Sequence, residues 1–269
     1  MFAGTNACVL QVIQEGGAQV LPFAMTFDPQ AEKFALVIPT LNEAGNIPTL
    51  FQRVQAALAP MNLDYELIVV DDDSQDGTGD VVEAYGARDP RIRLLVRKGE
   101  RGLAGAVIHG WKHTDANWLG VIDADLQHPP EILPELLNAI RSGDDIAIAS
   151  RYVTKNSVTN WNKMRQLISR CGTLATVPLQ RPGLRIKDPL AGFFVVRREC
   201  IEGIELQPQG FKILLEILVR GRIRKAKEIP YQFAQRHAGA SKADVKVALQ
   251  YLSLLGKLSR YAIFRPGNQ

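Results

Sequence analysis

Cysteine and long apolar runs are scarce in this 269-residue sequence. The three cysteines, Cys8, Cys171 and Cys200, are widely spaced and form neither a metal-binding pair nor a disulfide framework, so we expect a reducing compartment. No apolar run reaches the roughly 20 residues that cross a bilayer as a helix. The N-terminus also lacks a basic segment followed by an apolar one, the mark of a secretory signal. These absences argue against a disulfide-stabilised secreted protein.

The signatures of several enzyme classes are missing as well. No serine–histidine–aspartate arrangement is legible, and no Gly-rich triphosphate loop with a basic signature lies near the N-terminus, which argues against a nucleotidyltransferase. His109 and His113 stand four residues apart, but no glutamate of a zinc protease motif lies between them, so packing or surface positions are expected. The glycines Gly99, Gly102 and Gly105 lack the spacing of a dinucleotide fingerprint.

Charge of one sign is only slightly in excess. The net charge is +4, and hydrophobic and charged residues make up 46% and 22% of the chain, as in a globular protein with a full core. The basic segment 220–227 (RGRIRKAK) is compatible with an anionic membrane surface, with nucleic acid or with a solvated strand edge. It lacks interleaved aromatic residues that stack on bases, so we expect no nucleic-acid partner.

Short apolar runs alternate with amphipathic segments from Phe34 onward. The expected strands are 34–39, 66–71, 92–96, 118–122 and 145–150, and the expected helices are 47–58, 78–85, 104–113 and 130–140. This alternation predicts an α/β fold with a mainly parallel central sheet flanked by helices. Ligands of such sheets bind beyond the carboxyl ends of the strands.

The second half of the chain is less regular. The elements expected there are an amphipathic helix 161–175, a turn and strand over 188–197, a helix 211–219, a strand 226–233 and a last helix 243–261. No internal repeat or low-complexity linker divides the chain. We therefore expect a single domain over 33–262, after a variable extension 1–32 and before a tail 263–269.

Carboxylates gather where one buried strand is expected to end. Asp123 and Asp125 follow the run 118–122, and Gln127 comes two residues later. Alternate side chains of a strand share a face, so these three can point the same way. Oxygen ligands of this kind suit Mg²⁺ or Mn²⁺ bound together with substrate phosphates. The segment predicts chemistry on a phosphorylated substrate.

A second acidic cluster occupies residues 69–78 (VVDDDSQDGT). Its spacing from Asp72 onward matches a calcium-binding EF-hand loop, but a strand-like run precedes it where an EF-hand has a helix. The preferred interpretation is a strand end whose carboxylates bind a base or ribose. An acidic helix cap accounts for Ser74 and Asp76 but not for Asp71 and Asp72.

The segment 236–242 (RHAGASK) places a cation on each side of small residues, just before the last helix. Arginine and lysine on a flexible loop suit a lid that closes on a diphosphate. An ordinary solvated helix start fits the same residues, and both interpretations stay open.

Taken in order along the chain, these motifs resemble those of a known family. The matching segments are IPTLNE (38–43), VVDDDSQDGT (69–78), DADLQ (123–127) and RHAGASK (236–242). They look like family 2 glycosyltransferases of the Rossmann-like GT-A fold, and within that family like the dolichol-phosphate mannose synthase branch. The segments that strengthen the branch assignment are GLA (102–104), SRY (150–152) and DPLAGF (188–193). The resemblance spans about 34–261.

The resemblance implies roles for the matching positions. Those expected to bind the sugar donor are Pro39, Leu41, Glu43, Val70, Asp72, Asp123, Ala124, Arg151, Arg236 and Lys242. Those expected at the acceptor phosphate are Arg151, Arg165 and Ser169. The metal is expected on Asp125 and Gln127, and the catalytic role on Asp123, Asp125 and Arg236. Leu41 departs from the family's usual tyrosine, whose ring would contact the base.

The implied reaction moves a sugar, most simply mannose from GDP-mannose, to a dolichyl or polyprenyl monophosphate. It is expected to invert the anomeric carbon and to need Mg²⁺ or Mn²⁺. Another donor such as UDP-glucose remains an alternative, as does a polysaccharide or protein acceptor, which should not need Arg165 and Ser169. A non-catalytic sugar-nucleotide-binding module should have lost the metal ligands.

A lipid acceptor has to be reached at a membrane surface. The helix 161–175 and the basic-faced last helix can lie on such a surface or pack on the sheet. Packing is preferred for the last helix, and both are open for 161–175. Some relatives continue into transmembrane helices, whereas this chain ends at Gln269. We expect a cytoplasmic protein that is peripheral on the cytoplasmic face of a membrane, and a separate membrane-anchoring partner stays open.

Overall fold

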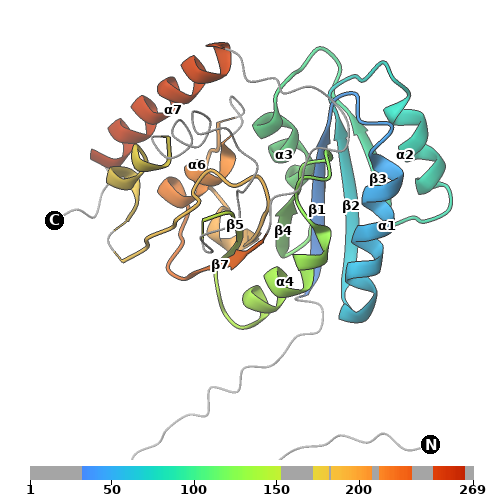
Figure 1. The fold of residues 1–269 in the computed structure, drawn as a ribbon, viewed down its shortest axis with the longest axis horizontal. Helices are drawn as coiled ribbons and strands as arrows, with labels where there is room; N and C mark the ends of the chain where they lie inside the picture. Colours follow the sequence, from blue (N-terminus) through green and yellow to red (C-terminus); the bar gives the residue numbers. More distant parts are fainter. Residues whose placement is uncertain (1–31, 153–171, 182, 208–211, 232–244, 264–269) are drawn as a thin grey trace, which may run out of the picture.

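The computed structural model describes residues 32–152, 172–181, 183–207, 212–231 and 245–263. The strands in these ranges are β1 (Lys33–Thr40), β2 (Asp64–Asp71), β3 (Ile92–Val96), β4 (Trp118–Val121), β5 (Ile146–Ser150), β6 (Phe194–Arg197) and β7 (Ala226–Pro230). They form one seven-stranded sheet in the order β3-β2-β1-β4-β6-β5-β7 (Figure 1).

Helices cover both faces of this sheet. The helices in the described ranges are α1 (Ile47–Leu58), α2 (Thr78–Gly86), α3 (Leu103–Lys112), α4 (Leu133–Arg141), α6 (Ile213–Arg220) and α7 (Val245–Ile263). Residues of α1, α2 and α4 share a core with one face, and residues of α3 and α6 share a core with the other. Helix α7 packs outside α6, at the upper left of Figure 1. None of the described helices is long and apolar enough to cross a bilayer.

Burial on both faces explains the unbroken apolar run of β1. Phe34, Leu36 and Ile38 lie in the core beneath α1 and α4, whereas Ala35 and Val37 lie in the core beneath α3 and α6. A strand covered on both sides reads as a continuous hydrophobic run rather than as an alternation.

Strand direction decides where a ligand can bind. Strand β1 is parallel to β2 and β4, β2 is parallel to β3, and β5 is parallel to β7. Only β6 in the described sheet runs the other way, antiparallel to both β4 and β5. The predicted single α/β domain with a mainly parallel sheet is therefore confirmed, and the six parallel strands end at one edge.

Most predicted elements are found within two residues of their expected bounds. The expected helix 130–140 is instead a 3₁₀ turn, η3 (Pro130–Ile132), followed by α4. Pro134 stands in the first turn of α4, where a missing N–H is tolerated. The expected helix 161–175 lies mostly outside the described residues, of which only its last residues from Gly172 onward are part.

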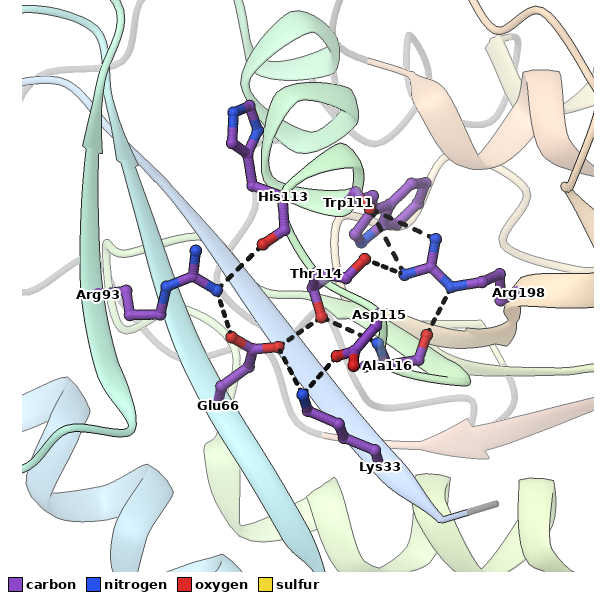
Figure 2. Close-up of polar contacts among 9 residues, drawn as sticks. All are labelled: Lys33, Glu66, Arg93, Trp111, His113, Thr114, Asp115, Ala116 and Arg198. Atoms are coloured by element: carbon purple, nitrogen blue, oxygen red, sulfur yellow. Dashed lines mark hydrogen bonds and ion pairs between the residues drawn. The ribbon is translucent and has the colours of Figure 1, made fainter. Parts of the chain in front are cut away.

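A polar network fixes the opposite, amino-terminal edge of the sheet (Figure 2). The nearly buried Glu66 on β2 accepts hydrogen bonds from Arg93 Nη1 on β3, at 2.6 Å, and from the Thr114 hydroxyl. Lys33 at the start of β1 lies 3.9 Å from Glu66 and also pairs with Asp115. The loop that leads into β4 is thereby tied to three strands.

Arg198 holds the same loop from the other side (Figure 2). It follows β6 and donates from Nε to the Ala116 carbonyl at 2.6 Å and from Nη2 to the Thr114 carbonyl at 2.9 Å. These bonds satisfy carbonyls beyond the C-terminal end of α3. The start of β4 is consequently fixed, and with it the strand that leads to Asp123 and Asp125.

Candidate functional site

Asp71 joins the carboxyl ends of β1 and β2. Its Oδ1 accepts hydrogen bonds from the Thr40 hydroxyl at 2.7 Å and from the Ser74 hydroxyl at 2.6 Å, and its Oδ2 accepts from the Ser74 amide at 2.7 Å. The carboxylate is almost fully buried. Asp71 therefore holds the framework of the site together rather than facing a ligand.

The loops that follow β1 and β2 are bonded to each other. Three successive backbone N–H groups of the first loop donate to side chains of the second. That of Asn42 donates to Ser74 Oγ at 2.7 Å, that of Glu43 to Thr78 Oγ1 at 2.9 Å, and that of Ala44 to Asp76 Oδ2 at 3.0 Å. Asn42 takes up the left-handed backbone region, with φ of 59°. The predicted donor residues of the first loop are thereby held against the second.

Asp76 is the charged member of this loop pair. Partial burial by itself raises the pKa of its carboxyl, but hydrogen bonds from the Thr78 hydroxyl and from the Ala44 and Thr78 amides outweigh burial and lower the pKa below its ordinary value. The ionised form is therefore the one that bridges the two loops.

Asp72 is clamped from two sides. Its Oδ1 accepts from Arg97 Nε at 2.8 Å and from Arg97 Nη2 at 2.5 Å, and its Oδ2 accepts from the Gly102 amide at 2.8 Å. Asp72 and Arg97 are each 5% exposed. A carboxylate offers about four acceptor positions, so the clamp leaves Asp72 room for one further donor. The sequence analysis did not identify Arg97, because no local motif indicates that it pairs with a residue 25 positions away in the chain.

The two acidic residues of DADLQ come from a turn and not from a strand. Strand β4 ends at Val121, and Leu126 takes up a left-handed conformation with φ of 60°. Strand alternation therefore does not carry Asp123 and Asp125, and that part of the prediction is wrong. The backbone N–H of Gln127 donates to Asp125 Oδ1 at 3.1 Å, which closes the turn.

Asp123 is the more open of the two acids, with 29% of its side chain exposed. A β-carbon added at Gly192 would lie 2.7 Å from Asp123 Oδ2, so the backbone of residue 192 passes directly beside the carboxylate. His128 Nδ1 lies 3.8 Å from the same oxygen. The His128 ring packs near Phe193 and Tyr231, and burial lowers its pKa to about 4. His128 is consequently neutral at neutral pH, and sequence reasoning did not single it out.

Arg151 follows β5 and forms an ion pair with a buried acid, Asp188. Its Nε and Nη2 donate to the two oxygens of Asp188 at 2.8 and 2.7 Å, and its amide donates to Asp188 Oδ2 at 3.0 Å. Asp188 is fully buried, and its own amide donates to Glu228 Oε1 on β7 at 3.0 Å. The guanidinium plane of Arg151 is thereby fixed in direction, as phosphate recognition requires.

The described part of the predicted site lies along one edge of the sheet. Pro39 and Val70 are the last residues but one of β1 and β2, the segment 123–127 follows β4, and Arg151 follows β5. The predicted positions outside the described residues are Arg165, Ser169, Arg236 and Lys242. The described members of the expected donor set, the two acids and Arg151 thus lie at the carboxyl edge of the sheet.

The donor atoms fit a hard cation. Within the described ranges no three histidine, cysteine, aspartate or glutamate side chains gather as a complete metal cage. Asp125 supplies a carboxylate and Gln127 a side-chain amide, and the Gln127 backbone N–H bonds to Asp125 Oδ1, which keeps the two residues in one turn. Mg²⁺ is commonly held by one or two carboxylates, with substrate phosphates and water completing its shell. The residues present therefore suit a cation that arrives with a diphosphate.

Known proteins of similar sequence are mannosyltransferases. A dolichol-phosphate mannosyltransferase of Pyrococcus furiosus is 44% identical over 85% of this chain, which spans 64% of that relative's length. Those of Saccharomyces cerevisiae and Mycosarcoma maydis are 34% and 33% identical over 84% of this chain and cover 86% and 79% of their own lengths.

Solved structures support the same architecture. Glucosyl-3-phosphoglycerate synthase from Mycobacterium tuberculosis, in complex with Mn²⁺, UDP-glucose and phosphoglyceric acid, superposes with a TM-score of 0.57 at 21% identity, covering 86% of this chain and 77% of its own. This likeness confirms the GT-A fold. The sequence profile described as Glycosyl transferase family 2 matches residues 35–204. The chain belongs to glycosyl transferase family 2.

Proposed function

We propose that the protein transfers mannose from GDP-mannose to a dolichyl or polyprenyl monophosphate, with inversion at the anomeric carbon. The observation that carries the proposal is the 44% identity, over 85% of the chain, to a dolichol-phosphate mannosyltransferase. The site supports it with oxygen ligands for a cation after β4 and a fixed arginine after β5.

The donor nucleoside binds, in this proposal, between the bonded loops at the ends of β1 and β2. Pro39, Leu41, Glu43 and Val70 line it, and Asp72 accepts a single hydrogen bond from the base or ribose. Asp123 and Ala124 face the mannose and the diphosphate. Arg236 and Lys242 close on the diphosphate from their loop.

The acceptor phosphate binds to Arg151, Arg165 and Ser169. One of its oxygens attacks the anomeric carbon of mannose as the bond from that carbon to the diphosphate oxygen breaks, and GDP leaves with the bonding electrons. A phosphate monoester is already ionised near neutral pH, so no side chain has to remove a proton from it.

Charge accumulates on the leaving diphosphate during this step. Mg²⁺ or Mn²⁺, held by Asp125 and Gln127, supplies Lewis-acid stabilisation of that charge when bound. Arg236 adds a second cation close to the same oxygens, which is electrostatic stabilisation of the kind that dominates many enzymes. Asp123 orients the sugar for attack from the opposite side.

The test is a transfer assay with Mg²⁺ or Mn²⁺, a polyprenyl phosphate and a panel of labelled GDP- and UDP-sugars. We expect label from GDP-mannose in a lipid-extractable product, and transfer from a UDP-sugar alone would replace the proposed donor. Asp125→Ala should lower the rate by about 100-fold or more. Asp80→Ala, at an exposed position on α2, is the control. An Asp125→Ala protein with full activity would remove the metal assignment.

We further propose a peripheral position on the cytoplasmic face of a membrane, without a nucleic-acid partner. Helix α7 uses Leu254 and Leu258 to pack on α6, whereas Leu252 is 62% exposed. Leu174 and Val177, beside α7, are 70% and 38% exposed. Flotation with anionic liposomes should carry the protein upward, and Leu174→Ser with Leu252→Ser should reduce the floated fraction. Equal flotation of both proteins would count against this surface.

A further inference from the structure

The turn 188–192 touches three charged groups of the site. Asp188 at its start grips Arg151, and the Ala191 amide donates back to the Asp188 carbonyl at 3.2 Å. The backbone at Gly192, at its end, passes beside the Asp123 carboxylate. In its middle, the Leu190 carbonyl accepts a hydrogen bond from Lys212 Nζ at 3.1 Å. Lys212 is therefore held against the same short segment that orients Arg151.

Lys212 stands immediately before α6 and is partly buried. Burial and, after it, the nearby Arg151 guanidinium lower its pKa to about 8, against the opposing influence of Asp123 and Asp188. Asp188 already binds Arg151 through both oxygens. Lys212 and Arg151 thus lie close enough for their positive charges to oppose each other, with Asp123 and Asp188 as nearby acids, and a bound phosphate would add negative charge beside both cations.

We propose that Lys212 is a further binding residue of this site and that its ammonium contacts a substrate phosphate beside Arg151. The inference rests on the proposed function, because both the donor diphosphate and the acceptor monophosphate are phosphates of that reaction. An ammonium on a flexible stem is a point charge that suits a phosphate oxygen. Partial burial strengthens such a contact, since the surrounding dielectric is lower than that of water.

The alternative is that Lys212 has only a structural role, in which its ammonium donates to the Leu190 carbonyl and does not contact a substrate phosphate. Two substitutions separate the alternatives. Lys212→Met keeps the apolar stem and removes the charge, whereas Lys212→Arg keeps the charge. Lys227→Met, at an exposed position on β7, is the matched control for loss of one positive charge. Thermal unfolding of each protein reports whether the fold is retained.

Two probes identify which phosphate Lys212 contacts. Calorimetric titration with GDP and Mg²⁺ reports the donor side, and titration with farnesyl phosphate reports the acceptor side. We expect Lys212→Met to weaken one of the two by about tenfold, or 1.4 kcal/mol, with Lys212→Arg recovering most of the affinity. In the unaltered protein the affected affinity should fall as pH rises above about 8, and Lys212→Met should lack that fall.

The outcomes keep this inference apart from the proposed function. Affinities of Lys212→Met within twofold of the unaltered protein for both probes would overturn the role of Lys212 and leave the function standing. An equal loss in Lys212→Met and Lys227→Met would overturn it too, because a general loss of charge would then explain the effect. An unaltered protein that bound neither probe would remove the proposed function and Lys212 with it.

Discussion

Gly192 sets the position of a carboxylate by having no side chain. A β-carbon there would lie 2.7 Å from Asp123 Oδ2, closer than such atoms approach in proteins, and 3.3 Å from its carboxyl carbon. Gly192→Ala must therefore displace Asp123, and we expect kcat to fall by at least about tenfold, since small misplacements of a catalytic group are costly. Affinity for GDP should fall less than kcat, because the proposed nucleoside contacts at the ends of β1 and β2 are not displaced.

The control for this change is Gly256→Ala. A β-carbon at Gly256 on α7 would meet nothing within 4 Å. In a helix interior this substitution should stabilise the protein by about 0.5–1 kcal/mol and leave transfer unchanged. Steady-state kinetics and urea unfolding measure both effects. Wild-type kcat in Gly192→Ala would show that Asp123 does not need its present position.

Some residues of the candidate site can be identified from the sequence, and others cannot. Asp123 and Asp125 stand out because acids rarely follow an apolar run without a reason. Lys212 and Arg97 do not stand out, because their partners, the Leu190 carbonyl and Asp72, lie 22 and 25 residues away in the chain. Long-range pairing depends on the folded sheet, and no local pattern encodes it.

At the scale of elements, one ion pair connects β2, β3 and α3. Asp72 follows β2, Arg97 follows β3, and Gly102 is the residue that precedes α3. Gly102 has φ of 129°, a conformation that favours glycine. The pair thereby sets how α3 begins beside the proposed nucleoside site.

Replacing one member of the Asp72–Arg97 pair should lower the free energy of unfolding more than replacing both members. Asp72→Asn leaves the buried Arg97 guanidinium with only the exposed Glu100 carboxylate, 2.9 Å from its Nη1, as a counter-charge. We expect a loss of about 3 kcal/mol in the free energy of unfolding. The double variant Asp72→Asn with Arg97→Met should recover part of that loss. Urea unfolding of the single and double variants gives the coupling energy. Purely additive effects would mean that the two side chains act independently.

The same variants separate a structural from a ligand role for Asp72. Arg97→Met frees the carboxylate without removing it, so GDP affinity should survive if Asp72 accepts a bond from the nucleoside. In the double variant that affinity should drop. Equal GDP affinity in both would limit Asp72 to holding Arg97 and Gly102.

The elements and the mainly parallel sheet were predictable from local composition and from the alternation of strands and helices, but the reversed direction of β6 was not. The apolar runs of β1, β2 and β4 predict buried strands because helices cover both faces of the sheet. The run FVVR of β6 is equally apolar, yet it lies antiparallel between β4 and β5. An apolar run carries no information on direction, which is set by which neighbours the connecting segments allow.

Over the whole molecule, the two edges of the sheet have different chemistry. The amino-terminal edge carries ion pairs of Glu66 and hydrogen bonds from Arg198 to backbone carbonyls, whereas the carboxyl edge carries the acids, Arg151 and Lys212. A parallel sheet alone is enough to predict that ligands bind at the carboxyl edge. The order of the strands could not be predicted, because it depends on how seven strands pack between helices rather than on any one segment.

Several ion pairs and hydrogen bonds make the fold sensitive to acid. Hydrogen bonds from Arg91 lower the pKa of Asp89, those from Arg53 lower the pKa of Glu131, and loop contacts lower the pKa of Asp76 against the effect of burial. A carboxyl whose pKa is lower in the folded state stabilises the fold above its unfolded pKa of about 4. That stabilisation disappears as pH falls through the folded-state pKa. Burial raises the pKa of Glu216, which acts in the opposite sense.

The predicted result is a melting temperature that is level above about pH 5 and falls below about pH 4. Asp76→Asn isolates the loop contribution, because an amide is a weaker acceptor than a carboxylate for the Thr78 hydroxyl and the Ala44 amide. It should melt below the unaltered protein at pH 7, and the difference should be smaller at pH 3, because Asp76 becomes protonated as pH falls toward its lowered pKa. Asp80→Asn, exposed on α2, is the control. A difference of the same size at both pH values would show that the charge of Asp76 does not hold the two loops together.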